Sequence, residues 1–414
     1  MSKRAFDRDS SSPKRQCQHE VVIRGVTYDI RATRHVDLSN KWMEYVPASL
    51  GSLTALTQLD LSCNCLRTVP AELGCLAALT HLNISANDLT TVPAELGRIA
   101  ALAQLVLSHN RLQALPAELG HLAALTHLNL SNNWLAALPA EFGSLTALTQ
   151  LDLSNNQLTA FPAEFGRLAA LTQLYLSQNR LQALPAELGH LTALTQLDLS
   201  YNQLKSVPAK LGRLTALAQL CLSHNRLQAL PAKLGRLTAL AQLYLSHNQL
   251  KSVPAELGHL TALMVLGLSH NQLESVPADI GCLTALSRLE LSHNQLVSVP
   301  AKLCHLDSLV RLDLSHNQLE SVPANLARLK VVVDIYIANN PMPFVPLCIV
   351  VLGAPTGARC RALLAKEQRK LDIAFPTQRD STLYTSAGLA RDVQRLICDF
   401  VVAQPYKVVM EPLQ

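Results

Sequence analysis

The chain contains few aromatic residues and no long hydrophobic run, although about half of it is apolar. Aromatic residues make up 4% of the 414 residues and hydrophobic residues 49%, so leucine and alanine supply most of the apolar mass. The longest apolar run, FVPLCIVVLGA at residues 344–354, is far shorter than the ~20 residues that cross a membrane. A chain of this length exceeds what one compact core usually organises, which favours several domains or a repeat array.

Motifs that support catalysis are also missing. The sequence has no GxxxxGK[ST], GxSxG, HExxH or CxxC, and residues 353–360 supply glycines without the lysine of a phosphate loop. No pair of carboxylates lies in an apolar setting that would tune a pKa. Cys63 and Cys65 come close in sequence to Cys75, but Cys63 and Cys75 are expected on different sides of a turn, which argues against zinc. We therefore expect no enzyme activity, no catalytic residue, no cofactor and no metal.

Charge is unevenly placed along the chain. Residues 1–34 hold eight Lys/Arg against four Asp/Glu, and residues 347–414 hold nine against six. The middle has 18 against 20, so a near-neutral body lies between two mildly basic ends. This balance argues against nucleic acid as the main ligand of the body.

The N-terminal residues show no secretory signal, because no apolar segment follows their basic and serine residues. The pairs Lys3-Arg4 and Lys14-Arg15 resemble half of a bipartite nuclear signal, and a solvated disordered tail is the alternative. The ten cysteines are scattered rather than grouped in a cap, which indicates reduced thiols. We expect a cytoplasmic protein, or a nuclear one if the basic pairs act as a signal, and we expect no membrane contact.

One phrase, LSHNQLKSVPAELGHLTAL in one version, recurs throughout the middle of the chain. Fourteen prolines, from Pro47 to Pro346, keep a constant step of 23 residues. An asparagine keeps the same step without insertion or deletion at Asn64, Asn87, Asn110, Asn133, Asn156, Asn179, Asn202, Asn225, Asn248, Asn271, Asn294, Asn317 and Asn340. Such a period indicates a solenoid whose turns bury their leucines only by stacking, here about 14 turns over residues 34–346.

These residues resemble the leucine-rich repeat superfamily, whose LxxLxLxxNxL signature matches LTQLDLSNNQL at residues 148–158. The resemblance covers about three quarters of the chain. It implies an α/β repeat solenoid: a horseshoe with a concave parallel β-sheet and short helical or 3-10 turns on the convex side. The remainder, xxVPAELGxLTA, is similar to the 23-residue class of intracellular Ras-group repeat proteins, which implies partners in signalling pathways.

The residues of one turn are consistent with that fold. Leu151 and Leu153 are two apart and share one face of a strand, which we expect to run to the following serine. Asn156 follows where the chain must turn inward, and its amide can bond turn backbone groups that no ladder reaches. Pro162 and Gly166 frame a short helical turn, with proline at its first position and glycine at its exit.

The two ends of the solenoid are expected to be sealed by caps. We predict a capping hairpin at residues 21–33 and a helical C-terminal cap or small domain at residues 347–414, with a basic disordered tail at residues 1–20. Residues 389–402, LARDVQRLICDFVV, are faintly similar to the helical core of F-box segments but lack the leading Leu-Pro. The alternative function is therefore a substrate receptor of a ubiquitin ligase, in which the C-terminal helices recruit the ligase.

Outward strand positions are free to specialise, so we expect a partner protein on the concave face of a monomeric, non-enzymatic scaffold. Aromatic and arginine side chains are favoured anchors of interfaces. The candidate contacts are Trp134, Tyr175, Tyr201, Tyr244, Arg288 and Arg311, together with the column His224, His247, His270, His293 and His316. On neighbouring strands these imidazoles are expected to stack at about 4.8 Å.

A basic patch is expected on the outer side of the array. Most turns read PAEL, but Lys210 and Lys233 replace the acid, and Arg213 and Arg236 follow them. Lys205 and Lys251 lie nearby in sequence. The patch is either a solvated face or a docking surface for an acidic partner segment.

Overall fold

The computed structural model describes residues 20–329, 331 and 334–342. The chain divides into two compact units, Met1–Gly357 and Ala358–Gln414, and every described residue belongs to the first. Nearly all of the predicted tail and the predicted helical cap with its F-box-like segment lie outside the described residues.

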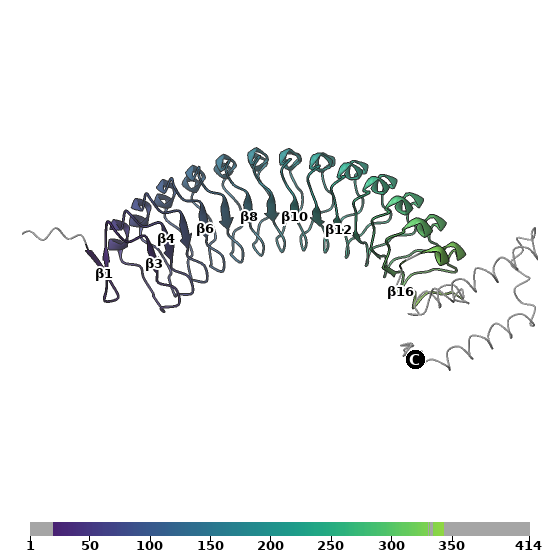
Figure 1. Cartoon of the computed structure of the whole chain (residues 1–414), viewed down its shortest axis with the longest axis horizontal. Helices are drawn as coiled ribbons and strands as arrows, with labels where there is room; N and C mark the ends of the chain where they lie inside the picture. Colours follow the sequence, from purple (N-terminus) through teal and green to yellow (C-terminus); the bar gives the residue numbers. More distant parts are fainter. Residues whose placement is uncertain (1–19, 330, 332–333, 343–414) are drawn as a thin grey trace, which may run out of the picture. The chain divides into compact units, whose positions relative to one another are not determined.

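Fourteen short parallel strands form one sheet in sequence order, so each turn pairs only with its neighbours (Figure 1). The sheet contains β3 (His35–Asp37), β4 (Gln58–Asp60), β5 (His81–Asn83), β6 (Gln104–Val106), β7 (His127–Asn129), β8 (Gln150–Asp152), β9 (Gln173–Tyr175), β10 (Gln196–Asp198), β11 (Gln219–Cys221), β12 (Gln242–Tyr244), β13 (Val265–Gly267), β14 (Arg288–Glu290), β15 (Arg311–Asp313) and β16 (Asp334–Tyr336). Each strand pairs in perfect register with the next, so residues 23 apart lie side by side, as Leu197 and Leu220 do. The predicted horseshoe of about 14 turns is confirmed.

The strands end earlier than the sequence predicts. β8 stops at Asp152, two residues before the expected Ser154. Hydrogen bonds between turns nevertheless continue, because the backbone N–H of Leu153 donates to the carbonyl of Tyr175 at 2.8 Å and that of Asn155 to Ser177 at 2.8 Å. The column of serines therefore lies on the loop that leaves the sheet, still held in register.

Short 3-10 helices line the outer side of the arch (Figure 1). They are η1 (Ala48–Ser52), η2 (Ala71–Cys75), η3 (Ala94–Arg98), η4 (Ala117–His121), η5 (Ala140–Ser144), η6 (Ala163–Arg167), η7 (Ala186–His190), η8 (Ala209–Arg213), η9 (Ala232–Arg236), η10 (Ala255–His259), η11 (Ala278–Cys282), η12 (Ala301–His305) and η13 (Ala324–Arg328). Each follows a proline in extended conformation and contains five residues, a length typical of 3-10 pieces.

The predicted roles of Pro162 and Gly166 need correction. Pro162 precedes η6 as its N-cap, with φ −65° and ψ 142°, rather than standing at the first helical position. Gly166 lies inside η6 and does not mark its exit. A Cβ built there would lie 2.6 Å from the carbonyl oxygen of Glu187, so glycine is needed because the next turn packs against its backbone.

Leucine fills the space between the sheet and the outer helices. Leu148, Leu151, Leu153 and Leu158 are fully buried, and the same positions are buried in the other turns except at the two ends of the array. Each such side chain contributes roughly 1.5–3 kcal/mol on leaving water. The three phenylalanines of the described residues, Phe142, Phe161 and Phe165, lie close together, with the rings of Phe161 and Phe165 4.6 Å apart. Because no single turn encloses its own leucines, the core is continuous along the array.

The asparagine column connects consecutive turns from inside. Asn225 is buried, and its Nδ2 donates to the carbonyls of Leu222 at 3.0 Å in its own turn and Leu199 at 2.9 Å in the preceding one. Its Oδ1 accepts from the backbone N–H of Leu204 at 3.0 Å, also in the preceding turn. The same pattern repeats from Asn64 to Asn340.

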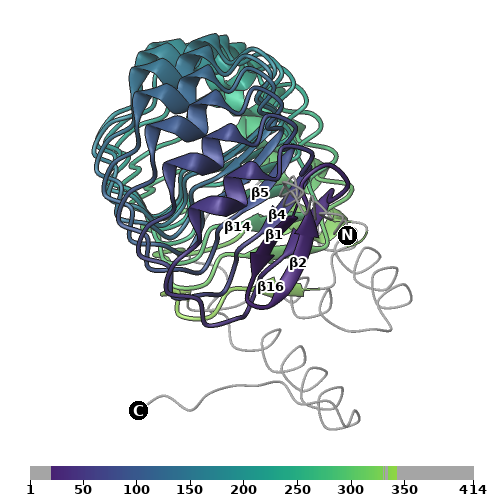
Figure 2. The ribbon, with the colours of Figure 1, turned by 90° about the vertical axis from the view of Figure 1, so that its left-hand side faces the viewer.

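A hairpin precedes the first turn, with β1 (Glu20–Ile23) antiparallel to β2 (Val26–Asp29) (Figure 2). Arg24 and Gly25 form its turn with positive φ. Val21 and Ile23 are buried and join the core of the array. The hairpin therefore covers leucine side chains that the first turn would otherwise expose to water.

Replacing Asn225 with alanine should destabilise the array by roughly 1–3 kcal/mol, because buried backbone groups of two turns lose their partners. Chemical denaturation followed by circular dichroism measures the change. The matched control is Gln249→Ala, an exposed residue on the loop of the next turn, which should shift the transition little. Equal shifts for the two variants would contradict the connecting role.

Candidate functional site

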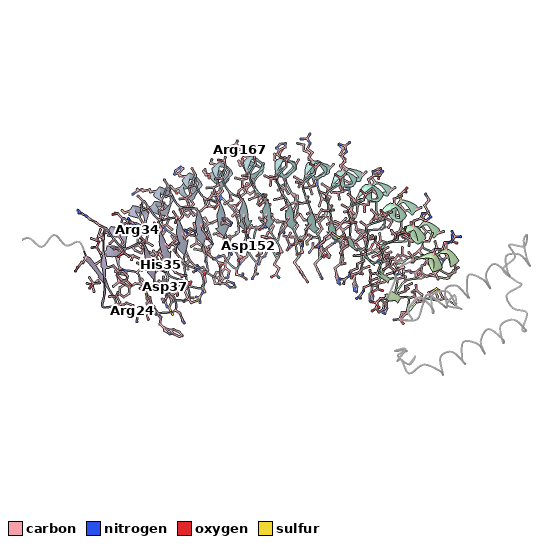
Figure 3. The ribbon with its side chains drawn as sticks, viewed as in Figure 1. Arg24, Arg34, His35, Asp37, Asp152 and Arg167 are labelled. Carbon is pink, nitrogen blue, oxygen red and sulfur yellow. The ribbon has the colours of Figure 1, made fainter. Side chains whose placement is uncertain are left out.

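Two columns of side chains run along the strands of the sheet, and one runs along the loops that follow the strands. The first column holds the first residue of each three-residue strand, and the third column holds the third and last residue of each strand. The loop column lies three residues after the third column and has positive φ in every turn, for example 54° at Asn155 and 56° at His224. Figure 3 labels Asp152, a member of the third column, on the inner side of the arch and Arg167 on its outer edge.

Most Asp and Asn residues of the third column serve the backbone. In six turns the Oδ1 atom accepts from both the backbone N–H and the hydroxyl of the serine two residues later, as Asp198 does from Ser200 at 2.9 and 2.7 Å. The same pair of bonds forms at Asp60, Asn83, Asn129, Asp152 and Asp313. These are Asx turns that hold the chain as it leaves the strand. Their side chains are thus already occupied, a role that the sequence interpretation missed.

Four consecutive turns depart from this pattern. On β11 to β14 the third column reads Cys221, Tyr244, Gly267 and Glu290. Because residue 267 has no side chain, nothing from β13 separates Tyr244 from Glu290 in this column, and the three positions are neighbours in register. In these four turns the third-column residue is therefore not Asp or Asn and forms no Asx turn, so its side chain departs from the residue that most other turns carry there.

The two candidate tyrosines of the third column are half-buried and hydrogen-bonded. The Tyr175 hydroxyl donates to Oε1 of Gln196 at 2.6 Å, and that of Tyr244 to Oε1 of Gln242 at 3.2 Å. Burial raises the pKa of both phenols. Each ring therefore lies against the sheet as a pre-ordered surface with a polar tip, which is the form in which tyrosine serves interfaces.

Arg288 and Arg311 lie side by side in the first column of β14 and β15. Nη1 of Arg288 is 3.7 Å from a carboxylate oxygen of Glu290, and the guanidinium of Arg311 lies 4.9 Å from the centre of the Tyr336 ring. Nε of Arg311 is buried and has no hydrogen-bond partner among the described residues. The two guanidinium groups therefore place adjacent positive charge in the first column, while the buried Nε of Arg311 faces away from solvent.

The histidines form a continuous stack in the loop column. Ring centroids of His224, His247, His270, His293 and His316 follow one another at 4.0–4.1 Å with planes 10–12° apart. This is closer than the expected 4.8 Å. Tyr201 stacks on His224 at 4.0 Å, and Asn339 bonds Nε2 of His316 at 2.9 Å, so both ends of the stack are covered.

Proximity disfavours charge on this histidine stack. Burial lowers the pKa of His224, His270 and His293, and the neighbouring imidazoles lower it further. Asp313 acts in the opposite direction on the pKa of His293. The rings of His224, His270 and His293 are thus held in their neutral form at neutral pH.

Trp134, His109, Cys63 and Cys75 lie on loops or outer helices rather than on strands. Trp134 is 48% exposed on the loop beyond Asn133, so it is not a concave strand residue. His109 lies in the loop column but apart from the stack, where it contacts Asn132 at 3.3 Å. Cys63 and Cys75 are exposed free thiols. Within the described residues, no group of three or more His, Cys, Asp or Glu side chains could hold a metal ion.

Family comparisons agree with the geometry. Residues 163–271 match a leucine-rich repeat region, and residues 34–89, 100–158, 134–181 and 284–342 match a leucine-rich repeat. A solved leucine-rich repeat protein from Leptospira interrogans is 31% identical over 81% of this chain and 95% of its own, with a TM-score of 0.60. The chain belongs to the leucine-rich repeat family. No curated protein matches it.

Two receptor structures are also similar. A plant peptide hormone receptor, RGFR1, solved in complex with RGF2, is 29% identical over 75% of this chain with a TM-score of 0.68. The Drosophila Toll protein, solved in the Toll–Spatzle complex, is 26% identical over 73% with a TM-score of 0.60. This chain spans only 52% and 47% of those two chains. The leucine-rich repeat relatives indicate a protein-interaction scaffold in general. Among the described residues, no helix is long and apolar enough to cross a membrane.

Acid should destabilise the histidine stack. Because the folded-state pKa values of His224, His270 and His293 lie below the usual 6.5, the unfolded chain takes up protons first as pH falls. Folding stability is therefore full above pH ~6.5 and declines below it. Adjacent charges about 4 Å apart repel by roughly 1 kcal/mol per pair in water, less in salt.

Thermal melts at pH 7.5 and pH 5 test this prediction, with a variant carrying glutamine at all five positions as the control. Glutamine suits the site, since Gln178 occupies the same column with φ 55°. The natural chain should lose more stability than the control on acidification, and identical losses would contradict the prediction.

The Cys221 thiol should resist alkylation, because burial raises its pKa to about 11. At pH 8 iodoacetamide should modify it on the order of a hundredfold more slowly than an exposed thiol. Peptide mapping by mass spectrometry compares it with Cys63 and Cys75, which are exposed. Comparable rates at all three would show that Cys221 is open to solvent.

Proposed function

We propose that this chain is a non-enzymatic scaffold that binds a partner protein on its concave face, over strands β11 to β15. The carrying observation is the run Cys221, Tyr244, Gly267 and Glu290, where the third column is released from its Asx role. The same turns carry Arg288 in the first column and the histidine stack in the loop column. We call this set of residues the concave patch: Cys221, Tyr244, Gly267, Glu290, Arg288 and Arg311, with the histidine stack from His224 to His316.

The chemistry of the concave patch suits a protein surface. Tyr244 presents a pre-ordered ring and Arg288 an exposed guanidinium, and such side chains dominate interface energies. At Gly267 the Tyr244 ring and the Glu290 carboxylate close over the backbone, 3.6 and 3.8 Å from where a Cβ would lie, so the two side chains form one continuous surface. Support also comes from the plant peptide hormone receptor and Toll, each solved with a polypeptide partner.

We further propose that the scaffold acts inside the cell, in signalling, as the likeness to the 23-residue intracellular class implies. All six cysteines of the described residues are unpaired, which suits a reducing compartment. The residues that would instead recruit a ubiquitin ligase lie outside the described part, so the concave patch alone carries the proposal.

Photocrosslinking tests the binding face. The amino acid benzoylphenylalanine placed at Tyr244 should give one discrete adduct in cells that express the chain natively. The same residue at Glu118 on η4, on the outer side, is the control. Combining Arg288→Ser and Arg311→Ser with the Tyr244 crosslinker should remove most of the adduct, since interface anchors are lost.

Circular dichroism should show that these variants keep their fold, because all three side chains extend from the sheet without entering the leucine core. Crosslinking from Glu118 with the same adduct, or no adduct from Tyr244, would contradict the proposed face.

A further inference from the structure

Charge is sharply segregated along the array. Residues 199–255 hold seven Lys/Arg and no Asp/Glu. Residues 70–198 before them hold nine acids against four cations, and residues 256–342 after them hold eight against five. A cationic stretch of two to three turns thus lies between two acidic ones.

Six of the seven cations define a surface that we call the basic belt: Lys205, Lys210, Arg213, Lys233, Arg236 and Lys251. All six are exposed. Lys210 and Arg213 belong to η8, and Lys233 and Arg236 to η9. Figure 3 shows the outer position on which the arginines lie, because Arg213 and Arg236 occupy the same place in their turns as Arg167. The four belt residues of η8 and η9 therefore lie on the outer side of the array, opposite the concave patch, while Lys205 and Lys251 lie on the loops before the outer helices.

Close packing holds these like charges together. A Cβ on Gly212 of η8 would overlap the carbonyl oxygen of Lys233 on η9, so the two helices approach as closely as backbone allows. Equivalent cations on η8 and η9 are consequently neighbours. Lys205 and Lys251 begin the segments that lead into the helices of their own turns, and the seventh cation, Arg226, lies on the loop after β11.

Few partners within the chain neutralise the basic belt. Lys210 approaches Glu187 of η7 at 3.9 Å, where both side chains are well exposed. Across the described part of the chain, the other five residues form no ion pair within 4 Å. All seven preceding outer helices carry Glu or Ser at the position of Lys210, so the repeat itself does not require lysine there.

We propose that the basic belt is a second docking site, which binds a short acidic polypeptide segment of a partner protein. Carboxylates would satisfy the clustered ammonium and guanidinium groups. The length of the belt sets the length of the segment. At about 4.8 Å per turn on the sheet side, and more on the outer side, its three turns match four to six extended residues at about 3.3 Å each.

The flanking charge disfavours nucleic acid. A strand that follows the array would run beyond the belt onto acidic turns on either side, where its phosphates are repelled. A polypeptide can confine its acids to one short segment. It also needs no bases stacked on aromatic rings, and none of the six belt residues is aromatic.

Fluorescence anisotropy with fluorescein-labelled hexaglutamate tests the site on the full chain. Binding should be detectable at 50 mM NaCl and weaken strongly at 300 mM NaCl, because exposed charges are screened. Lys233→Glu should weaken it about tenfold, since an attraction becomes a repulsion. The variant should fold, because glutamate is the residue that most turns carry at this position.

The chain offers a matched control in Lys302→Glu. Lys302 occupies the same position on η12, three turns away, so the substitution changes charge equally at an equivalent backbone site. It should alter hexaglutamate binding less than about twofold. Equal weakening by the two variants would show that only the net charge of the chain matters, which would contradict a local site. Absence of binding to the natural chain would also overturn the proposal.

A labelled oligonucleotide of six deoxythymidines, with similar charge, completes the experiment. Weaker binding than hexaglutamate supports a polypeptide partner, and tighter binding overturns that assignment. Photocrosslinking from Tyr244 should be unchanged in Lys233→Glu, which separates the basic belt from the concave patch.

Discussion

The structure depends on the bonds that each buried asparagine makes to two turns at once. Asn225 bonds the carbonyls of Leu222 and Leu199 and the N–H of Leu204, so its amide satisfies turn backbone groups that the sheet ladder cannot reach. Every leucine pair in the core requires the adjacent turn to be in place, and the asparagine fixes that placement. Stability is therefore a sum over neighbouring turns, and damage to one turn weakens its two interfaces first.

Perfect register has a functional consequence as well. Because no turn carries an insertion, any residue that recurs at one position becomes a continuous stripe on the surface. Five copies of histidine become rings stacked at about 4.1 Å, and two lysines in successive turns become adjacent charges on η8 and η9. Glycines such as Gly166 permit the close approach of the outer helices that this requires. In such an array, the surface properties that differ from turn to turn come from the positions at which the repeated residue is replaced.

The sequence was sufficient for the architecture because leucine, asparagine and proline repeat at one period that only stacked turns satisfy. The sequence was insufficient for predicting which side chains hydrogen-bond to the backbone of the loops. Outward strand positions such as Asp152 look free to specialise from the sequence alone, yet the Asp152 oxygen holds Ser154 in an Asx turn. Asp or Asn two residues before serine is the signal in the sequence that could have shown this role. The sequence also favours a concave position for Trp134, because the end of a strand cannot be fixed from an alternating pattern such as LNLSNNWL at residues 128–135. The true contact residues remain a prediction for a related reason: a partner, absent from the sequence, decides which exposed groups matter.

The concave patch and the basic belt occupy overlapping turns on opposite sides, which bears on how two partners could act together. Tyr244 and Lys233 belong to the segment between Asn225 and Asn248, the residues that fix this turn against its neighbours. A ligand on either side adds contacts to the same interfaces between turns. In a stack governed by neighbour interactions, both ligands would favour the folded form of those turns. Coupling between the two sites would therefore appear as joint stabilisation of residues 199–271, without a change in the shape of the arch.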